Sequence, residues 1–93
     1  MKMLVVCGSG LGSSFMIEMN VKEILKEINA KNVDIDHSDL GSASPDQADV
    51  FIVGKDLAGA AQSLGELIVL NNILDKQELK ERIVERLEKD SLI

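Results

Sequence analysis

The sequence predicts an α/β fold, a small three-layer sandwich built on a four-stranded parallel sheet. Short apolar runs alternate with amphipathic or polar segments along the chain, as strands alternate with helices in such folds. A loop rich in glycine and serine follows the first apolar run and precedes the first helical pattern. The chain has 93 residues and no compositional break or linker. We therefore expect one domain that spans residues 1–93.

The first strand is expected in the apolar run KMLVVC, residues 2–7. Continuous apolar runs of this kind are typical of strands that are buried on both faces of a parallel sheet. Because glycines and serines follow directly, the strand is expected to end at or just after Cys7, which is the only cysteine in the chain.

The first helix is expected from about Ser14 to Asn29, because apolar residues recur there at mostly three- to five-residue intervals. Either Ser13 or Ser14 is expected to cap its first turn. The predicted buried residues are Phe15, Met19, Ile24, Leu25 and Ile28. The predicted exposed residues are Glu18, Lys22, Glu23, Lys26 and Glu27. Met16 is also expected to pack in the core.

The remaining strands are expected at VDIDH (33–37), VFIVG (50–54) and ELIVL (66–70). The first of these alternates apolar and polar residues, and the second is continuously apolar and predicts a fully buried strand. Residues 38–49 are interpreted as a loop with a helical turn after Pro45. Residues 56–63, DLAGAAQS, are interpreted as a short, weak helix.

The last helix is expected to begin near Asp75. Asp75 and Glu78 are spaced as in a capping box, in which each side chain bonds the backbone N–H group of the other residue. The predicted apolar stripe consists of Leu79, Ile83, Val84 and Leu87. The other residues of this helix are mostly charged, which predicts a solvated face.

The predicted strand order is 2-1-3-4, which places the first strand in the centre of the sheet. In open parallel sheets, ligands bind beyond the carboxyl ends of the strands, near the point where the strand order reverses. Cys7 and the loop after it lie at that point. Lys55 follows the third strand at the same edge, and we expect it to be an ordinary exposed lysine.

The composition excludes several classes of function. Sixteen acidic residues against ten basic ones, and two aromatic residues in all, are unsuited to nucleic-acid binding. No apolar stretch approaches the roughly 20 residues that a membrane span needs. A lone cysteine forms neither an internal disulfide nor a cysteine zinc cluster, and it suits a reducing, cytoplasmic location. His37, the sole histidine, is expected to be a partly exposed strand residue, and neither a metal nor an organic cofactor is expected.

The loop CGSGLGSS, residues 7–14, has the composition of a phosphate cradle. Its glycines let backbone amides approach an anion closely, and the start of the following helix adds free amides and the positive end of the helix dipole. The predicted phosphate-binding residues are Gly8, Ser9, Gly10, Leu11, Gly12, Ser13 and Ser14. Cys7 lies at the base of this cradle. The helix N-terminus is expected to lower the pKa of its thiol and to make it a nucleophile.

Two kinds of nucleotide-binding loop fit this sequence poorly. A nucleotide P-loop needs a lysine after its glycines, and the chain has none between Lys2 and Lys22. A dinucleotide-binding loop would have a glycine at the position of Ser13. The chain is also short for the two nucleotide-binding halves of that fold.

A small cysteine-dependent phosphatase is a third candidate for the loop. Its loop ends in an arginine that clamps the phosphoryl group, and Ser13 stands at that position. Hydrolysis also needs a general acid. Asp39, Asp46 and Asp56 are available, but the sequence singles out none of them. These departures weaken hydrolysis relative to phosphoryl transfer.

The segment VVCGSGLGSSFMIEMNVKEIL, residues 5–25, resembles the start of IIB components of the sugar phosphotransferase system, closest to the ascorbate-specific branch. That branch has a strand, a Cys-Gly-x-Gly-x-Gly-Ser-Ser loop and a helix rich in methionine. The residues that match its loop are Cys7, Gly8, Gly10, Gly12, Ser13 and Ser14. The resemblance continues more loosely at DLAGAA (56–61) and at LIVLNNILDKQEL (67–79).

The resemblance implies a cytoplasmic phosphoryl carrier. In this family the loop cysteine, here Cys7, accepts a phosphoryl group from a phosphohistidine of a IIA component. The cysteine then passes the group to a sugar bound by the membrane IIC component, which is L-ascorbate in the ascorbate branch. Two alternatives stay open. One is a phosphatase or arsenate reductase on the same scaffold, and the other is a regulatory module that senses an anion without chemistry.

Overall fold

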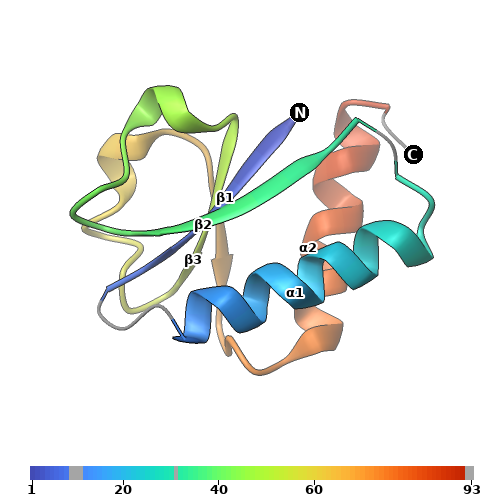
Figure 1. Cartoon of the computed structure of the whole chain (residues 1–93), viewed down its shortest axis with the longest axis horizontal. Coiled ribbons are helices and arrows are strands. Elements are labelled where there is room, and N and C mark those ends of the chain that lie inside the picture. Colours follow the sequence, from blue (N-terminus) through green and yellow to red (C-terminus); the bar gives the residue numbers. More distant parts are fainter. Residues whose placement is uncertain (9–11, 31, 92–93) are drawn as a thin grey trace.

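Four parallel strands form a sheet in the predicted order, β2-β1-β3-β4 (Figure 1). The computed structural model describes residues 1–8, 12–30 and 32–91, without the side chains of residues 12 and 13. The strands are β1 (Lys2–Cys7), β2 (Asp34–Asp39), β3 (Val50–Gly54) and β4 (Leu67–Leu70). The helices are α1 (Gly12–Glu27) and α2 (Lys76–Lys89), with two 3-10 helices, η1 (Pro45–Gln47) and η2 (Gln62–Leu64).

The two faces of the sheet are covered by different kinds of structure (Figure 1). Because side chains alternate along a strand, Met3 and Val5 of β1 face the layer formed by α1 and α2. Leu4 and Val6 face the other way, onto the segments 40–48 and 57–64, which contain the 3-10 helices. The three-layer architecture is therefore confirmed, and its third layer consists of loops and 3-10 helices.

The register of the strands fixes what lies at each edge of the sheet. Lys2 pairs with Asp34 at the start of β1 and β2, and Cys7 pairs with Asp39 at their ends. Val5 pairs with Ile52 of β3, and each strand continues for two more residues, β1 to Cys7 and β3 to Gly54. The ends of the two central strands consequently lie side by side.

The predicted helix at residues 56–63 is wrong. The segment folds as successive turns, in which Leu57 N–H bonds the carbonyl oxygen of Gly54 at 3.0 Å and Ala61 N–H bonds that of Leu57 at 2.9 Å. These turns are followed by the short 3-10 helix η2 and not by an α-helix. Glycine at position 59 weakens a helix by about 1 kcal/mol relative to alanine, and Ala61 is instead fully buried against the sheet.

The predicted buried face of α1 is partly wrong. Phe15, Met16 and Met19 are exposed, with exposed fractions of 51%, 38% and 53%. Ile17 and Val21 are buried in their place, while Ile24 and Leu25 are buried as predicted. Glu18, which was expected on the exposed face, is also buried. Near its start, α1 is therefore rotated so that its largest apolar side chains face solvent and not the sheet.

The predicted apolar stripe of α2 is confirmed for Leu79, Ile83 and Leu87, which are buried, while Val84 is only partly buried. The predicted capping box is half correct. Asp75 accepts a hydrogen bond from Glu78 N–H at 3.1 Å. The Glu78 carboxylate does not return this bond, because it accepts from the N–H groups of Asn71 and Asn72, both at 3.0 Å.

Candidate functional site

Cys7 lies at the carboxyl end of the central strand β1, where it is half-buried. It borders an open pocket of about 360 Å³ at this edge of the sheet. The residues that line the pocket are Val6, Cys7, Gly8, Gly54, Asp56, Leu57 and Ile73. The pocket thus combines the ends of β1 and β3 with the turns after β3 and the loop before α2.

Two glycines bring the walls of this pocket close together. A Cβ atom on Gly8 would lie 3.4 Å from a methyl group of Leu57. A Cβ atom on Gly54 would lie 2.7 Å from Oδ1 of Asp56 and 3.2 Å from Cγ2 of Ile73. Because a real Cβ almost never approaches an atom to 2.7 Å, the present position of the Asp56 carboxylate requires glycine at position 54.

The start of α1 reaches the thiol from the other side. The helix begins at Gly12, so neither Ser13 nor Ser14 caps it from outside, and the predicted boundary at Ser14 is two residues too late. Ser14 is fully buried in the first turn, and its side chain hydrogen-bonds with Cys7. Of the predicted phosphate cradle, Gly8 and Ser14 therefore lie close to the thiol.

Part of the predicted cradle lies outside the described residues. Ser9, Gly10 and Leu11 belong to this part, as do the side chains of Gly12 and Ser13. The described ends of the loop are Gly8 after β1 and the first backbone turn of α1. The first amides of an α-helix have no partner within the helix, which makes them donors for an anion.

The pKa of the Cys7 thiol lies above its ordinary value, so the predicted lowering is wrong. Burial raises the pKa most, because it disfavours the thiolate. The hydrogen bond with Ser14 lowers it, and the negative charge of Asp56 raises it further. Burial and the charge of Asp56 thus disfavour the thiolate form of Cys7.

Asp56 is the acidic residue that the sequence did not single out. It lines the pocket with Cys7 and acts on the thiol by its charge. Asp46, by contrast, lies on η1, in the segment that leads to the start of β3, and it does not line this pocket. The sequence signal for Asp56 was shared with Asp39, since Asp56 lies two residues after the end of β3 and Asp39 ends β2, and both strands neighbour β1.

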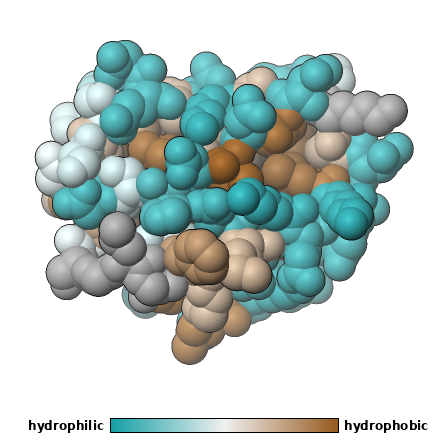
Figure 2. All heavy atoms as spheres, viewed as in Figure 1, coloured by the Kyte–Doolittle hydropathy of each residue, from teal (hydrophilic) through white to brown (hydrophobic). Residues whose placement is uncertain are grey.

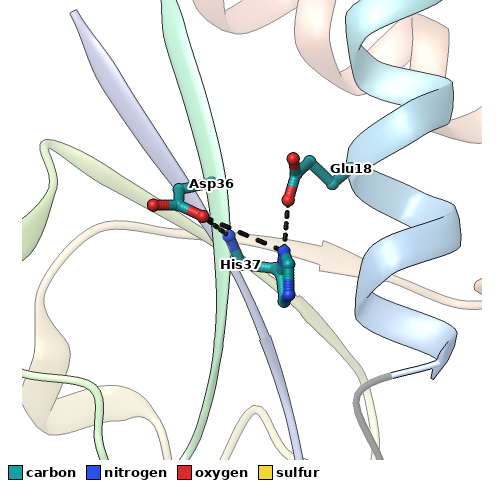
Figure 3. Close-up of side chains that lie close together, drawn as sticks. All are labelled: Glu18, Asp36 and His37. Carbon is teal, nitrogen blue, oxygen red and sulfur yellow. Dashed lines mark hydrogen bonds and ion pairs between the residues drawn. The ribbon is translucent and has the colours of Figure 1, made fainter.

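A second cluster joins α1 to β2 (Figure 3). Nδ1 of His37 hydrogen-bonds with Oε1 of Glu18, and Lys22 lies 3.0 Å from the other Glu18 oxygen. Burial alone would raise the pKa of Glu18, but the hydrogen bonds from His37 and Lys22 bring it below its ordinary value. The Asp36 carboxylate accepts a hydrogen bond from the backbone N–H group of His37 at 2.8 Å. His37 is a partly exposed strand residue, as predicted. Its hydrogen bond with Glu18 was not predicted from the sequence.

The carboxylates of Glu18 and Asp36 and the imidazole of His37 offer ligand atoms within 4.8 Å of one another. This is the spacing of a metal site. However, Glu18 is already paired with His37 and Lys22, and Asp36 lies 3.9 Å from Lys2. These pairings explain why the three side chains lie close together: they belong to a network of hydrogen bonds and ion pairs that holds α1 against the edge strand β2.

Exposed apolar side chains gather on the first half of α1, the helix that follows Cys7 in the chain (Figure 2). We call Phe15, Met16 and Met19 the apolar patch. The ring of Phe15 lies edge-on to that of His37, with 5.8 Å between the ring centroids. Lys55, at the end of β3, is exposed as predicted. Within the described residues, no helix has the length and the apolar character needed to cross a bilayer.

The sequence matches the protein family described as PTS system, Lactose/Cellobiose specific IIB subunit, over residues 2–85. The chain belongs to this family. It is therefore a IIB domain, a phosphotransferase component of the sugar phosphotransferase system. Among curated protein sequences, none gives a significant match.

The fold of this IIB domain is similar to that of two solved structures. One is the lactose-specific IIB component domain of the phosphoenolpyruvate:carbohydrate phosphotransferase system from Streptococcus pneumoniae, with 18% identity, 95% of each chain covered and a TM-score of 0.66. The other is a flavodoxin from the domain Archaea, with 15% identity, 96% of this chain and 98% of that chain covered, and a TM-score of 0.51. At these identities the similarity shows the fold.

Proposed function

We propose that this IIB domain carries a phosphoryl group on Cys7, between a phosphohistidine of a IIA component and a sugar held by a membrane IIC component. The observation that supports this role most directly is the position of the thiol. It lies at the carboxyl end of the central strand, beside a pocket, and it hydrogen-bonds with the first turn of α1. A nucleophile at that point faces the anion-binding end of a helix.

The cradle for the phosphoryl group in this proposal consists of Gly8, Ser9, Gly10, Leu11, Gly12, Ser13 and Ser14. Backbone amides would hold the three equatorial oxygens while the sulfur and the leaving atom lie in line with phosphorus. No metal or organic cofactor is needed, because the phosphoryl donor is another protein. Catalysis then consists mainly of positioning and of electrostatic stabilisation.

The partners of the proposed reaction must reach Cys7, and the apolar patch lies on the first half of α1, the helix whose Ser14 hydrogen-bonds with Cys7. We propose that the patch contacts the IIA and IIC components in turn, as part of a small and transient interface. Apolar side chains exposed to this extent are typical of such contact surfaces. The proposed location is the cytoplasm, where both partners present their phosphoryl-transfer sites, and no nucleic acid is involved.

The proposed sugar is L-ascorbate, because the loop residues 7–14 resemble the ascorbate branch most closely. The description of the matched family names lactose and cellobiose instead. Membrane vesicles that contain the cognate IIC component, supplied with the phosphorylated protein, distinguish these sugars. Phosphorylation of ascorbate, with none of lactose or cellobiose, is the expected result. The reverse preference would contradict the assignment.

The role of Cys7 is tested by incubating the protein with phosphoenolpyruvate, enzyme I, HPr and a matching IIA component. Intact-mass spectrometry should show one added phosphoryl group, which the Cys7→Ser variant lacks. His37→Gln is the matched control, since His37 is the only histidine and could otherwise be the acceptor. It should be phosphorylated like the wild type. A wild-type protein that stays unmodified beside a competent IIA component would contradict the carrier role.

A second candidate function is favoured by the position of Asp56. A carboxylate in the pocket of a nucleophilic cysteine is the arrangement that a cysteine phosphatase uses for its general acid. The two functions differ in the fate of the phosphorylated Cys7. Steady release of phosphate from a simple aryl phosphate would support the phosphatase. A long-lived phosphocysteine that is discharged only by an acceptor would support the carrier.

A further inference from the structure

Asp56 brings a carboxylate into the same pocket as Cys7. It lies two residues after the end of β3, and it lines the pocket together with Cys7, Gly54 and Leu57. Its Oδ1 atom packs over Gly54, where a Cβ atom would be only 2.7 Å away. The absence of a side chain at position 54 is therefore what allows the carboxylate to occupy this wall of the pocket.

Asp56 also differs from the other charged residues that surround the thiol. Asp39 on β2 pairs with Cys7 in the sheet register, and Lys55 follows the end of β3. Among the described residues, however, Asp56 is the charged residue that lines the pocket with Cys7. Among the described side chains of α1, the Ser14 hydroxyl hydrogen-bonds with the thiol, and it is uncharged.

We propose that the negative charge of Asp56 influences phosphoryl transfer through Cys7. The charge disfavours the anionic forms of Cys7, and it thereby favours transfer of the phosphoryl group from Cys7 to the acceptor. The proposal rests on the function proposed above for Cys7. It assigns to Asp56 a role in the direction of transfer and not in the making or breaking of a bond.

Cys7 changes its charge twice in one cycle. On loading, an S–P bond forms as the N–P bond of the donor's phosphohistidine breaks; the thiol loses its proton, and the donor imidazole nitrogen gains one. On delivery, a sugar hydroxyl oxygen forms an O–P bond as the S–P bond breaks, and the hydroxyl proton ends on sulfur. The loaded form is an anion and the unloaded form is a neutral thiol.

A fixed negative charge in the pocket raises the free energy of the anionic forms relative to the neutral thiol. The Asp56 carboxylate therefore opposes retention of the phosphoryl group on Cys7 and favours its delivery. It also keeps the unloaded cysteine in the thiol form, which is less readily oxidised than a thiolate. The same carboxylate thus protects unloaded Cys7 from oxidation and favours release of the phosphoryl group from loaded Cys7.

The test replaces the charge of Asp56 and measures two equilibria. The Asp56→Asn variant should lower the pH midpoint of Cys7 alkylation by iodoacetamide. It should also raise the ratio of phosphorylated to free protein, at equilibrium with a phosphorylated IIA component. Both effects should be roughly threefold to tenfold, as expected for one exposed charge in the same pocket. Asp56→Glu, which keeps the charge, should restore both values towards those of the wild type.

Asp34→Asn is the matched control, because Asp34 lies beside Lys2 in the strand register, at the opposite edge of the sheet from Cys7. It removes the same charge and should leave both measurements unchanged. Gly54→Ala is a second test, since the added Cβ displaces the Asp56 carboxylate from its present place. It should change both measurements in the same direction as Asp56→Asn.

Two outcomes would overturn the inference, and they are distinguishable. If wild-type Cys7 is phosphorylated but neither measurement moves in Asp56→Asn, the inference fails and the carrier function stands. If wild-type Cys7 is never phosphorylated by a competent IIA component, the carrier function and the inference fail together. Equal shifts in Asp56→Asn and Asp34→Asn would also overturn it, because they would reflect net charge alone.

Discussion

The His37 side chain on β2 and the Glu18 side chain on α1 are joined by a hydrogen bond that spans the interface between helix and sheet. The two residues are 19 positions apart in sequence. Lys22 completes the pairing of Glu18 from one turn further along α1. This network holds the first half of α1, which follows the Cys7 loop, against the edge strand.

Glu18→Ala should destabilise the protein by about 1 to 3 kcal/mol, because it leaves His37 without its buried partner. Urea unfolding measures this difference. Glu23→Ala is the control on the same helix, since Glu23 forms only an exposed ion pair with Lys76 and should change stability little. An equally large loss in Glu23→Ala would mean that removal of any carboxylate from α1, and not loss of the network, explains the effect.

The contribution of Glu18 should depend on pH in a defined direction. The pKa of Glu18 is lower in the folded protein than its ordinary value of 4.5, so the folded state favours the carboxylate. Its stabilisation is therefore fully present above that value and is lost as the pH falls through the lower, folded pKa. The stability difference between wild type and Glu18→Gln should shrink in that acidic range. A difference that is constant across it would contradict the assignment.

Ser14→Ala should raise the pKa of the Cys7 thiol further, because it removes the hydrogen bond that favours the thiolate. The pH midpoint of Cys7 alkylation should move upward, and phosphorylation by a IIA component should become slower. Ser38→Ala is the control, since the Ser38 hydroxyl bonds the carbonyl oxygen of Asp39 instead. A downward shift in Ser14→Ala would contradict the expected role of this hydroxyl.

Serine in place of Phe15 or of Met19 should slow phosphorylation of Cys7 by the IIA component by roughly tenfold or less, with little change in stability. Both side chains are mostly exposed and belong to the apolar patch on the first half of α1. Loss of one such contact from a small interface typically costs about 1 kcal/mol. Lys26→Ser, two turns beyond Met19 on the same helix, is the control. Unchanged phosphorylation rates in both patch variants would remove the patch from the interface.

Gly65→Ala should destabilise the protein by about 1 to 3 kcal/mol, because the φ of +124° at Gly65 is strained for any residue with a side chain. Thermal or urea unfolding measures this loss. Gly59→Ala is a matched control, since a Cβ there meets nothing within 4 Å and no positive φ is required. Similar losses in both variants would show that the backbone conformation is not the cause.

The sheet was predictable because its sequence signals are local. The run VFIVG at residues 50–54 is continuously apolar, and every residue of β3 is buried. The glycine-rich loop after Cys7 predicted the end of β1, and the alternation of strands and helices predicted the parallel order. The position of Cys7 at the carboxyl edge of the central strand then followed from the topology of open α/β sheets.

The orientation of α1 was not predictable from its own residues. Its largest apolar side chains suggested that Phe15 and Met19 were buried, but they are exposed at the surface beside the site. Glu18 is buried because His37, from a distant strand, supplies its partner. Likewise, Asp56 is distinguished from Asp39 and Asp46 only when the chain folds and brings the end of β3 beside Cys7.

The unequal covering of the sheet has a consequence for amide hydrogen exchange. The face that carries α1 and α2 is closed by long helices, whereas turns and 3-10 helices close the other. Local opening is easiest where regular hydrogen-bonded structure is least. Amides of the central strands β1 and β3 should therefore exchange slowest, and those of residues 55–61 much faster. The wall of the Cys7 pocket that bears Asp56 can then adjust to an incoming protein without disturbing the helices.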